Sequence, residues 1–205
     1  SVIEEKPSGA AIKATRTELK IPKNQLMLLS IGHLGQIKGH QDTLTALSKI
    51  VEKTAMDIHL YIAGDGSEDD KQRLNDRVNK LKIKENVTFL GQIDNTNKWL
   101  EACDIFIQPS IEEAFGIVFV EAGAKAKPVI ATAVGGIKEI IVTKETGLLV
   151  LPASPVELEA ALALLIHSPT LRAQYGDNAY NRIAEGFSLT NMVDKYAKIF
   201  EQIIK

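Results

Sequence analysis

The chain alternates short, continuously apolar runs with longer segments in which apolar residues recur at helical spacing. Apolar runs without polar alternation are typical of strands that are covered on both faces. We therefore predict six strands: Leu26–Ile31, Ile58–Ala63, Val87–Leu90, Asp104–Gln108, Val129–Ala131 and Leu148–Val150.

Helical patterns fill the segments between these strands, near residues 41–53, 67–80, 95–102, 115–126 and 136–141. After the last strand the pattern predicts only helices: Pro155–His167, Pro169–Gln174, Gly176–Glu185 and Leu189–Ile204. Alternation of strands and helices predicts an α/β fold, a Rossmann-like parallel sheet between two helical layers with extra C-terminal helices. Ligands bind such sheets at the carboxyl ends of the strands, so we expect a site in the loops that follow them.

The length of 205 residues fits one domain. Residues 1–24 contain Pro7, Gly9 and Pro22, and they are predicted to be a linker and a turn from a preceding, absent domain, leaving 25–205 as the folded domain. The formal net charge of -2 indicates no basic face, so no nucleic-acid partner is expected. A single cysteine, Cys103, cannot form an internal disulfide, which favours a reducing, cytoplasmic location.

Chemistry concentrates between the fourth strand and the helix that follows it. Glu113 lies in the loop, Glu121 lies in the helix, and Gly116 between them allows a close backbone approach. A helix N-terminus attracts phosphate through free N–H groups and its partial positive charge. A carboxylate such as Glu121 can accept two hydrogen bonds from a ribose diol. Together these features suit a nucleotide sugar.

The run from 112 to 121 resembles the glutamate-x7-glutamate motif of retaining GT-B glycosyltransferases, especially glycosyltransferase family 4 (group 1). Four further stretches resemble motifs of that family, in the same order: Ser30–Gly39, Ile62–Gly66, Val87–Gly91 and Lys127–Glu139. Order and spacing agree over roughly residues 25 to 200, nearly the whole chain.

The resemblance implies the C-terminal, donor-binding half of a GT-B enzyme, which transfers a sugar from a nucleotide-diphosphate sugar without a cofactor. The N-terminal, acceptor-binding half would be missing, so the isolated chain is expected to be inactive. Peripheral membrane association through the missing half, at the inner face of the membrane, and a role in polysaccharide biosynthesis are further expectations. The truncated chain is expected to self-associate through the apolar face of Leu189–Ile204.

The resemblance assigns catalytic roles to Lys38, which would neutralise the departing diphosphate, and to Glu113, which would contact the donor sugar. Glu121 would bind the ribose, and His33 stands where the family usually has arginine. The complete expected donor site is Gly32, His33, Gly35, Lys38, Gly64, Gly91, Gln92, Ile93, Glu113, Phe115, Gly116, Ile117, Val118 and Glu121. Taken singly, each charged residue could equally be a solvated surface group.

Three alternatives differ in class. A GT-B-fold nucleotide-sugar epimerase would need catalytic acids from the missing half, and a non-catalytic subunit of a split transferase would only bind the donor. A redox dinucleotide domain is disfavoured, because Gly32-x-x-Gly35-x-x-x-Gly39 is not the Gly-x-Gly-x-x-Gly fingerprint. No metal site is expected, since the histidines lack ligand spacing and no Asp-x-Asp pair occurs. The base, sugar and acceptor stay open.

Overall fold

A computed structural model of the chain describes residues 5–187 and the isolated positions Val193, Ala197 and Phe200. The helix expected at Leu189–Ile204, and the self-association assigned to its apolar face, therefore lie outside the described residues. No described helix is both long enough and apolar enough to cross a membrane.

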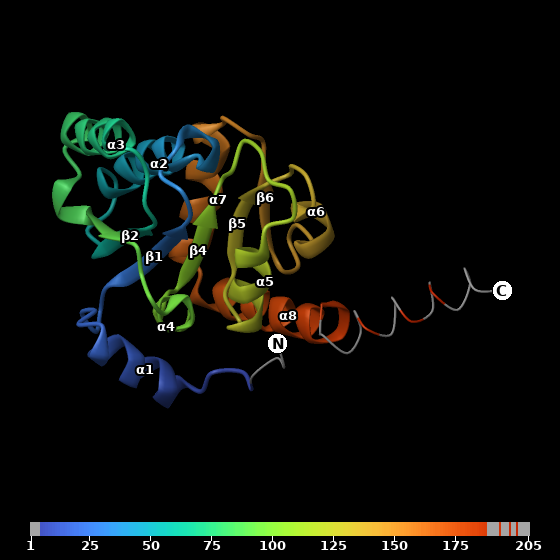
Figure 1. Ribbon diagram of the computed structural model, residues 1–205. Helices are drawn as coiled ribbons and strands as arrows, with labels where there is room; N and C mark the ends of the chain where they lie inside the picture. The colour runs from blue at the N-terminus through green and yellow to red at the C-terminus, as the bar shows by residue number, and fades with distance from the viewer. Residues whose placement is uncertain (1–4, 188–192, 194–196, 198–199, 201–205) are drawn as a thin grey trace.

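Six parallel strands form one sheet at the centre of the molecule, in the order β3-β2-β1-β4-β5-β6 (Figure 1). The strands are β1 Leu26–Ile31, β2 Ile58–Ala63, β3 Val87–Gly91, β4 Ile105–Gln108, β5 Val129–Thr132 and β6 Gly147–Val150. Each of the six predicted strands is present, within about one residue at either end, and the α/β, Rossmann-like fold is confirmed. The pairing is uneven: β1 and β2 share six register pairs, whereas β1 and β4 share two.

Helices cover both faces of this sheet (Figure 1). One face carries α2 His40–Val51, α3 Glu68–Leu81 and α7 Pro155–His167. The other carries α4 Thr96–Ala102, α5 Ile117–Ala124, α6 Ile137–Ile140 and α8 Pro169–Gly186, with α1 Gly9–Glu18 packed on α4. Short 3-10 turns lie at Gln36–Lys38 and Lys84–Asn86.

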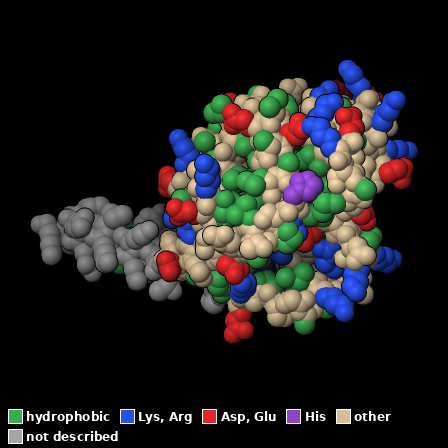
Figure 2. Space-filling model, turned by 180° about the vertical axis from the view of Figure 1, so that it is seen from behind, with side chains coloured by type: hydrophobic (Ala, Val, Ile, Leu, Met, Phe, Trp, Pro, Cys, Tyr) green, Lys and Arg blue, Asp and Glu red, His purple; other side chains and the backbone are tan. Residues whose placement is uncertain are grey.

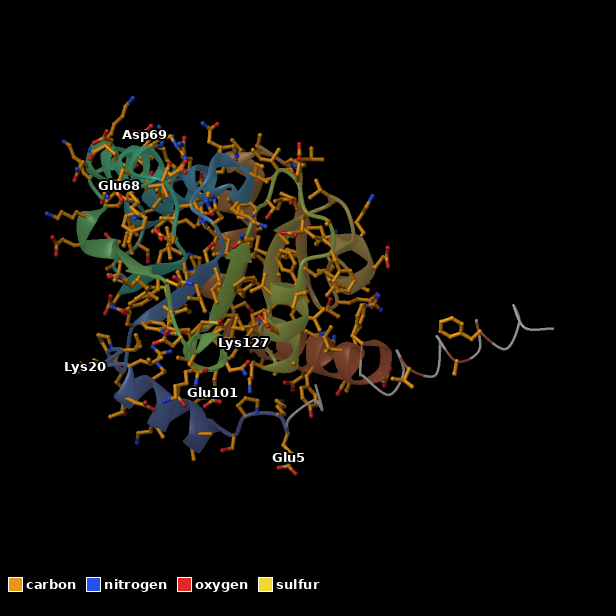
Figure 3. All side chains as sticks on the ribbon, in the orientation of Figure 1. Glu5, Lys20, Glu68, Asp69, Glu101 and Lys127 are labelled. Atoms are coloured by element: carbon orange, nitrogen blue, oxygen red, sulfur yellow. The ribbon has the colours of Figure 1, made fainter. Side chains whose placement is uncertain are left out.

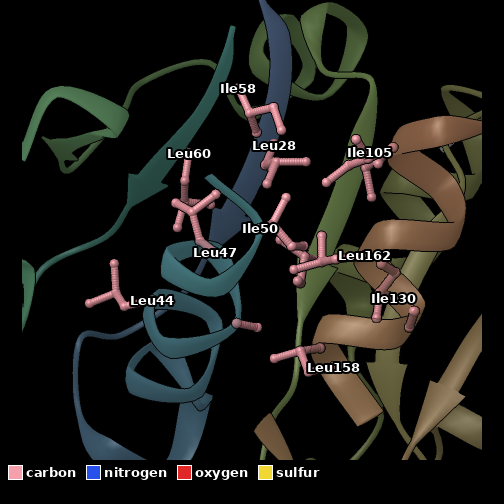
Figure 4. Packing of buried hydrophobic residues seen from close by; sticks show 14 of the residues in the cluster. Leu28, Leu44, Leu47, Ile50, Ile58, Leu60, Ile105, Ile130, Leu158 and Leu162 are labelled. Carbon is pink, nitrogen blue, oxygen red and sulfur yellow. The ribbon is translucent and has the colours of Figure 1, made fainter. Parts of the chain in front are cut away.

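Alternate residues of each strand face opposite helical layers and so build two cores. Along β1, Leu26 and Leu28 join the core under α2 and α7, whereas Met27 and Leu29 join the core under α4 and α5. Figure 4 shows the first core, in which leucines and isoleucines of the strands interlock with those of α2 and α7. Because both of their faces are covered, most strand positions are apolar, as the sequence pattern indicates, whereas β3, at the end of the sheet, has no fully buried residue.

Helices α1 and α8 differ from the sequence prediction. Residues 9–18, inside the expected linker, form α1, which has no buried residue and therefore little apolar periodicity to reveal it. The two helices expected on either side of Tyr175 are one continuous helix, α8. Gly176 does not break it; a Cβ there would lie 2.1 Å from the Ala126 carbonyl oxygen, so this glycine permits close packing.

The carboxyl ends of the strands lie at one edge of the sheet and the amino ends at the opposite edge (Figure 3). Glu68 and Asp69 begin α3 just after β2, at the carboxyl edge, whereas Lys127 donates a 2.7 Å hydrogen bond to the Glu101 carbonyl at the amino edge. Chain order reverses between the central neighbours β1 and β4, so their connections diverge to opposite faces. Such a switch point is where parallel α/β sheets bind ligands.

Candidate functional site

An ion pair spans the switch point. Lys38, in the β1–α2 loop (residues 32–39), places its Nζ 2.7 Å from Glu113 Oε2, in the β4–α5 loop (residues 109–116). Both side chains are largely covered, at 24% and 13% exposed. The Ile111 N–H also donates to the Ile37 carbonyl at 2.7 Å. Two residues that are 75 positions apart in the chain, and that were predicted to share a site, are therefore in direct contact.

Glycines bring the loops of three neighbouring strands together. The Gly64 φ of +139° is unfavourable for other residues, and a Cβ there would lie 1.9 Å from the Gly32 carbonyl oxygen. The Gly64 N–H donates to the Gly91 carbonyl at 2.8 Å. The expected site glycines Gly32, Gly64 and Gly91 thus follow one another along the carboxyl edge, and backbone packing fixes their spacing.

Gly116 ends the β4–α5 loop in a left-handed conformation, with φ +85°, and is the N-cap of α5. The helix therefore begins at Ile117, and the predicted start at Phe115 was wrong because the helical pattern cannot show a left-handed cap. A Cβ at Gly116 would lie 2.4 Å from the Phe119 ring and 3.2 Å from Glu113 Cγ. The first N–H groups of α5, those of Ile117 and Val118, have no partner within the helix.

Glu121 lies on α5, half-buried. Burial raises the pKa of its carboxyl group, and no cation among the described residues opposes this shift. A carboxylate that has lost part of its hydration, with no compensating cation, is well suited to accept hydrogen bonds from a ligand. The role of Glu121 at a sugar diol stays a prediction.

Gly135 and Gly136, in the loop after β5, pack against the backbone of the loop that carries Glu113. A Cβ at Gly135, where φ is +48°, would lie 1.7 Å from the Glu113 carbonyl oxygen. The Gly136 N–H donates to the Ala114 carbonyl at 3.1 Å. Phe115 is 42% exposed, and its ring packs 6.3 Å from that of Phe187, at the end of α8. The loop that carries Glu113 is therefore held by the loop after β5 and by α8.

His33 is exposed, and its Nδ1 accepts a 2.9 Å hydrogen bond from the Gly35 N–H. That bond requires a bare Nδ1, so the ring hydrogen of the neutral imidazole lies on Nε2. A Cβ at Gly35 would lie 2.8 Å from His33 Nδ1, which explains the glycine. His33 can thus offer one donor to a ligand, whereas an arginine would offer several.

The remaining expected residues lie at the β3 side of the same edge. A small cavity of about 140 Å³ is lined by Leu34, Gly64, Lys71, Asn75, Phe89 and Gly91. Gln92 is exposed and Ile93 is half-buried, and both follow Gly91 in the loop after β3. The glycine contacts connect this region to the Lys38–Glu113 pair, but β3 is two strands away from β1. The expected residues thus form two neighbouring groups along one edge.

Three buried polar residues beneath the β1–α2 loop were missed by the sequence reasoning: Ser30, His40 and Gln108. His40 Nε2 lies 3.2 Å from the His33 carbonyl oxygen. Burial lowers the His40 pKa to about 4, and the positive charge of Lys38 acts in the same direction. The available signal was the presence of polar residues in two otherwise apolar strands, one of them followed by a histidine at a helix start.

Other features of the described residues do not join this site. A larger cavity, of about 670 Å³, lies between α6 and α8 and contains none of the expected donor-site residues. Burial raises the pKa of the Cys103 thiol to about 12, so this cysteine is a core residue and not a nucleophile. Figure 2 shows basic and acidic side chains interspersed over one face of the molecule, around a region of exposed apolar side chains.

The chain is similar in sequence to known glycosyl transferases. The family profile "Glycosyl transferases group 1" matches residues 11–182. The chain is 31% identical to N-acetyl-alpha-D-glucosaminyl L-malate synthase of Bacillus anthracis over 94% of its own length and 51% of that protein. It is 29% identical to D-inositol 3-phosphate glycosyltransferase 2 of Catenulispora acidiphila, over 93% and 47%. The chain thus spans about half the length of these curated relatives.

The chain is also similar to solved structures of glycosyltransferases. The chain matches HepE of Anabaena, determined in complex with UDP-glucose, with a TM-score of 0.87 and 25% identity over 98% of this chain and 56% of that one. It also matches the C-terminal domain of the group 1 family protein LpcC from Francisella tularensis, with a TM-score of 0.79 and 28% identity, over 90% and 96%.

Proposed function

Since the chain belongs to the group 1 glycosyl transferases, we propose that it is the donor-binding domain of a GT-B enzyme that takes a sugar from a nucleotide-diphosphate sugar. The observation that carries this proposal is the placement of Lys38, Glu113 and the start of α5 together at the β1–β4 switch point. A cation, a carboxylate and free N–H groups are the three elements that a sugar linked to a diphosphate requires.

The phosphates are assigned to Lys38 and to the first N–H groups of α5. Lys38 bonds Glu113, and a partly exposed ion pair has a small net energy, so a doubly charged diphosphate can compete for the lysine. The N-terminus of α5 adds a partial positive charge that needs no side chain. In this proposal, these fixed charges take the place of a metal ion as the diphosphate departs.

The remaining contacts follow from the positions of the carboxylates. Glu113, freed from Lys38, accepts hydrogen bonds from hydroxyls of the donor sugar, and Glu121 accepts them from the ribose. The base lies along the loop that begins at Gly91 and continues through Gln92 and Ile93. His33, through its Nε2–H, supplies the donor that arginine usually provides.

We further propose a retaining reaction within glycosyltransferase family 4. The acceptor oxygen bonds to the anomeric carbon on the face from which the diphosphate leaves. The bond from that carbon to the phosphate oxygen breaks, and the proton of the acceptor hydroxyl passes to the departing phosphate oxygen. The acceptor site is assigned to another part of a longer protein, because the chain spans about half the length of its curated relatives. The relatives and structures reported above give no support to the epimerase alternative.

Calorimetric titration of the chain with UDP, GDP and ADP tests the donor-binding proposal. We expect saturable binding of at least one, and Lys38→Met should weaken it by about 1.5–3 kcal/mol, the range for hydrogen bonds to charged groups. Lys49→Met removes a lysine at the end of α2 that pairs with Glu52 on the surface, and it should leave binding unchanged. Absence of binding by the unaltered chain, or equal effects of the two substitutions, would contradict the proposal.

A further inference from the structure

The space beneath the β1–α2 loop is filled by three polar side chains, not by apolar ones. Ser30 lies on β1, Gln108 is the last residue of β4, and His40 is the first residue of α2. Each is at most 1% exposed. Burying polar groups costs free energy unless they are hydrogen-bonded, so an apolar trio would be expected here if packing were the only requirement.

Hydrogen-bond chemistry fixes the state of His40. The His33 carbonyl oxygen can only accept, so His40 Nε2, at 3.2 Å, must carry the hydrogen. Burial keeps the ring neutral at physiological pH, because its pKa is lowered to about 4. His40 Nδ1 is then a bare acceptor, and it faces Ser30 Oγ at 3.3 Å. The loop carbonyl is thereby connected through one imidazole to the central strand.

Gln108 extends this connection to the neighbouring strand and to the other end of the loop. Its Oε1 accepts the one hydroxyl hydrogen of Ser30, at 2.9 Å, so the 3.3 Å approach of Ser30 Oγ to His40 Nδ1 is a packing contact. The Gln108 Nε2 is buried and has no hydrogen-bond partner among the described residues. The same Nε2 is 2.7 Å from the point where a Cβ of Gly32 would lie, and the Lys38 Cγ is 3.3 Å from that point. Gln108 thus contacts the underside of the loop, between its first glycine and its lysine.

We propose that His40 is a positioning residue for donor binding, which holds the β1–α2 loop through the His33 carbonyl so that Lys38 meets the diphosphate. Ser30 and Gln108 hold His40 in turn and tie the loop to both strands of the switch point. This inference rests on the proposed function. Further hydrogen bonds hold the loop at other points: the Gly32 N–H bonds the Ala63 carbonyl, the Leu34 N–H bonds the Asp65 carbonyl, and the Ile37 carbonyl accepts from the Ile111 N–H.

A preorganised loop binds more tightly because less ordering remains to be done when the ligand arrives. His40 contacts no expected ligand group, so its effect must pass through the loop. A residue that acts in this way gives a non-additive result when it is combined with the residue it positions. A merely structural residue lowers stability but shows no such dependence on Lys38.

The test measures affinity for UDP, GDP or ADP, whichever the unaltered chain binds most tightly, in four variants. His40→Leu should weaken binding about tenfold, and His40→Gln, whose amide can still donate to the His33 carbonyl, should recover most of that loss. In a Lys38→Met background, His40→Leu should change affinity less than about threefold. Ser48→Ala removes another buried hydroxyl from α2, which bonds the Thr45 carbonyl, and it should leave affinity unchanged.

Hydrogen exchange measured without nucleotide separates this inference from the proposed function. In His40→Leu, amides of residues 32–39 should exchange about tenfold faster than any loss of global stability explains, whereas in Ser48→Ala they should not. Unchanged loop exchange, or a full tenfold loss of affinity in the Lys38→Met background, would overturn the positioning role. If the unaltered chain binds no nucleotide, the donor-binding proposal fails, while the exchange result still decides whether His40 holds the loop.

Discussion

At the scale of single residues, Glu113 forms an ion pair with Lys38 at 2.7 Å. In our proposal it also accepts hydrogen bonds from the donor sugar. Glu113→Gln removes the negative charge that competes with phosphate for Lys38. We therefore expect the nucleoside diphosphate to bind about 0.5–1 kcal/mol more tightly, the scale of a partly exposed ion pair. The nucleotide sugar should not gain, because the sugar loses a charged acceptor.

Calorimetry with the diphosphate and its sugar conjugate measures both effects. Glu112→Gln is the matched control, since the neighbouring carboxylate is exposed and should influence neither ligand. If Glu113→Gln weakens the diphosphate itself, Glu113 is not a competitor for Lys38.

Glu121 illustrates a group whose function costs stability. Burial raises its pKa in the folded chain above the unfolded value, so the folded state binds more protons in that interval. The contribution of the Glu121 carboxyl group to the free energy of unfolding is therefore most favourable at low pH, and it is lost as the pH rises through the pKa of the folded state. Glu121→Gln cannot ionise, so it should raise the free energy of unfolding at pH 7, with a benefit that shrinks towards acidic pH.

The same substitution should weaken nucleotide binding by about 1.5 kcal/mol, because an amide replaces a charged acceptor. The loss should be smaller for the corresponding 2′,3′-dideoxynucleotide, which lacks the ribose diol. Urea denaturation at several pH values and calorimetry provide the two measurements. Equal losses for the two nucleotides would remove the ribose from the role of Glu121.

At the scale of elements, the strands were predictable because both of their faces are buried. The bounds of β1 and β2 agree with the apolar runs Leu26–Ile31 and Ile58–Ala63. Prediction failed where the decisive contact is remote or the apolar face is missing. In α1 no residue is buried, so Gly9–Glu18 shows no clear core-facing stripe, and Gly176 was taken for a break because its partner, Ala126, lies 50 positions earlier in the chain.

In the candidate site, too, local features could be predicted from the sequence and contacts between distant residues could not. The glycines and carboxylates of the loops could be proposed as site residues because their motifs are local in the sequence. The Lys38–Glu113 ion pair joins two loops from different strands, so its existence depends on the strand order and not on any local pattern. His40 was considered only as a metal ligand, and the contacts of Ser30 with His40 and with Gln108 could not be foreseen without the register of β1 and β4.

Gly116→Ala tests the start of α5. A left-handed conformation costs a residue with a Cβ roughly 1–2 kcal/mol, and here the Cβ would also overlap the Phe119 ring. We expect the free energy of unfolding to fall by about 2 kcal/mol or more, together with a loss of nucleotide affinity as the first N–H groups of α5 move. Gly9→Ala, at the start of α1, has no atom within 4 Å of the new Cβ and should not destabilise the chain. An unaffected Gly116→Ala would show that the cap can relax at no cost.

At the scale of the whole molecule, we propose that the active site is a cleft between a donor-binding part and an acceptor-binding part. The described residues provide only the donor-binding wall of that cleft. Orienting two substrates across a closed site can contribute about 7–11 kcal/mol to lowering a barrier, and one wall cannot supply that orientation. We therefore expect the chain to bind nucleotide or nucleotide sugar while sugar transfer stays at background. Activity should return when the chain is joined to, or mixed with, the acceptor-binding half of a longer protein. Robust transfer by the chain alone would place an acceptor site within these 205 residues.

The pairing of the strands has a mechanical consequence. β1 and β4 share two register pairs, whereas β1 and β2 share six, so the seam between the half-sheets β3-β2-β1 and β4-β5-β6 is the shortest in the sheet. The Lys38–Glu113 pair and the proposed nucleotide both cross that seam at its carboxyl end. A bound donor would contact both half-sheets at the place where they share the fewest backbone pairs, and it would therefore hold them together. The lifetime of the folded domain would rise and fall with the supply of its own substrate.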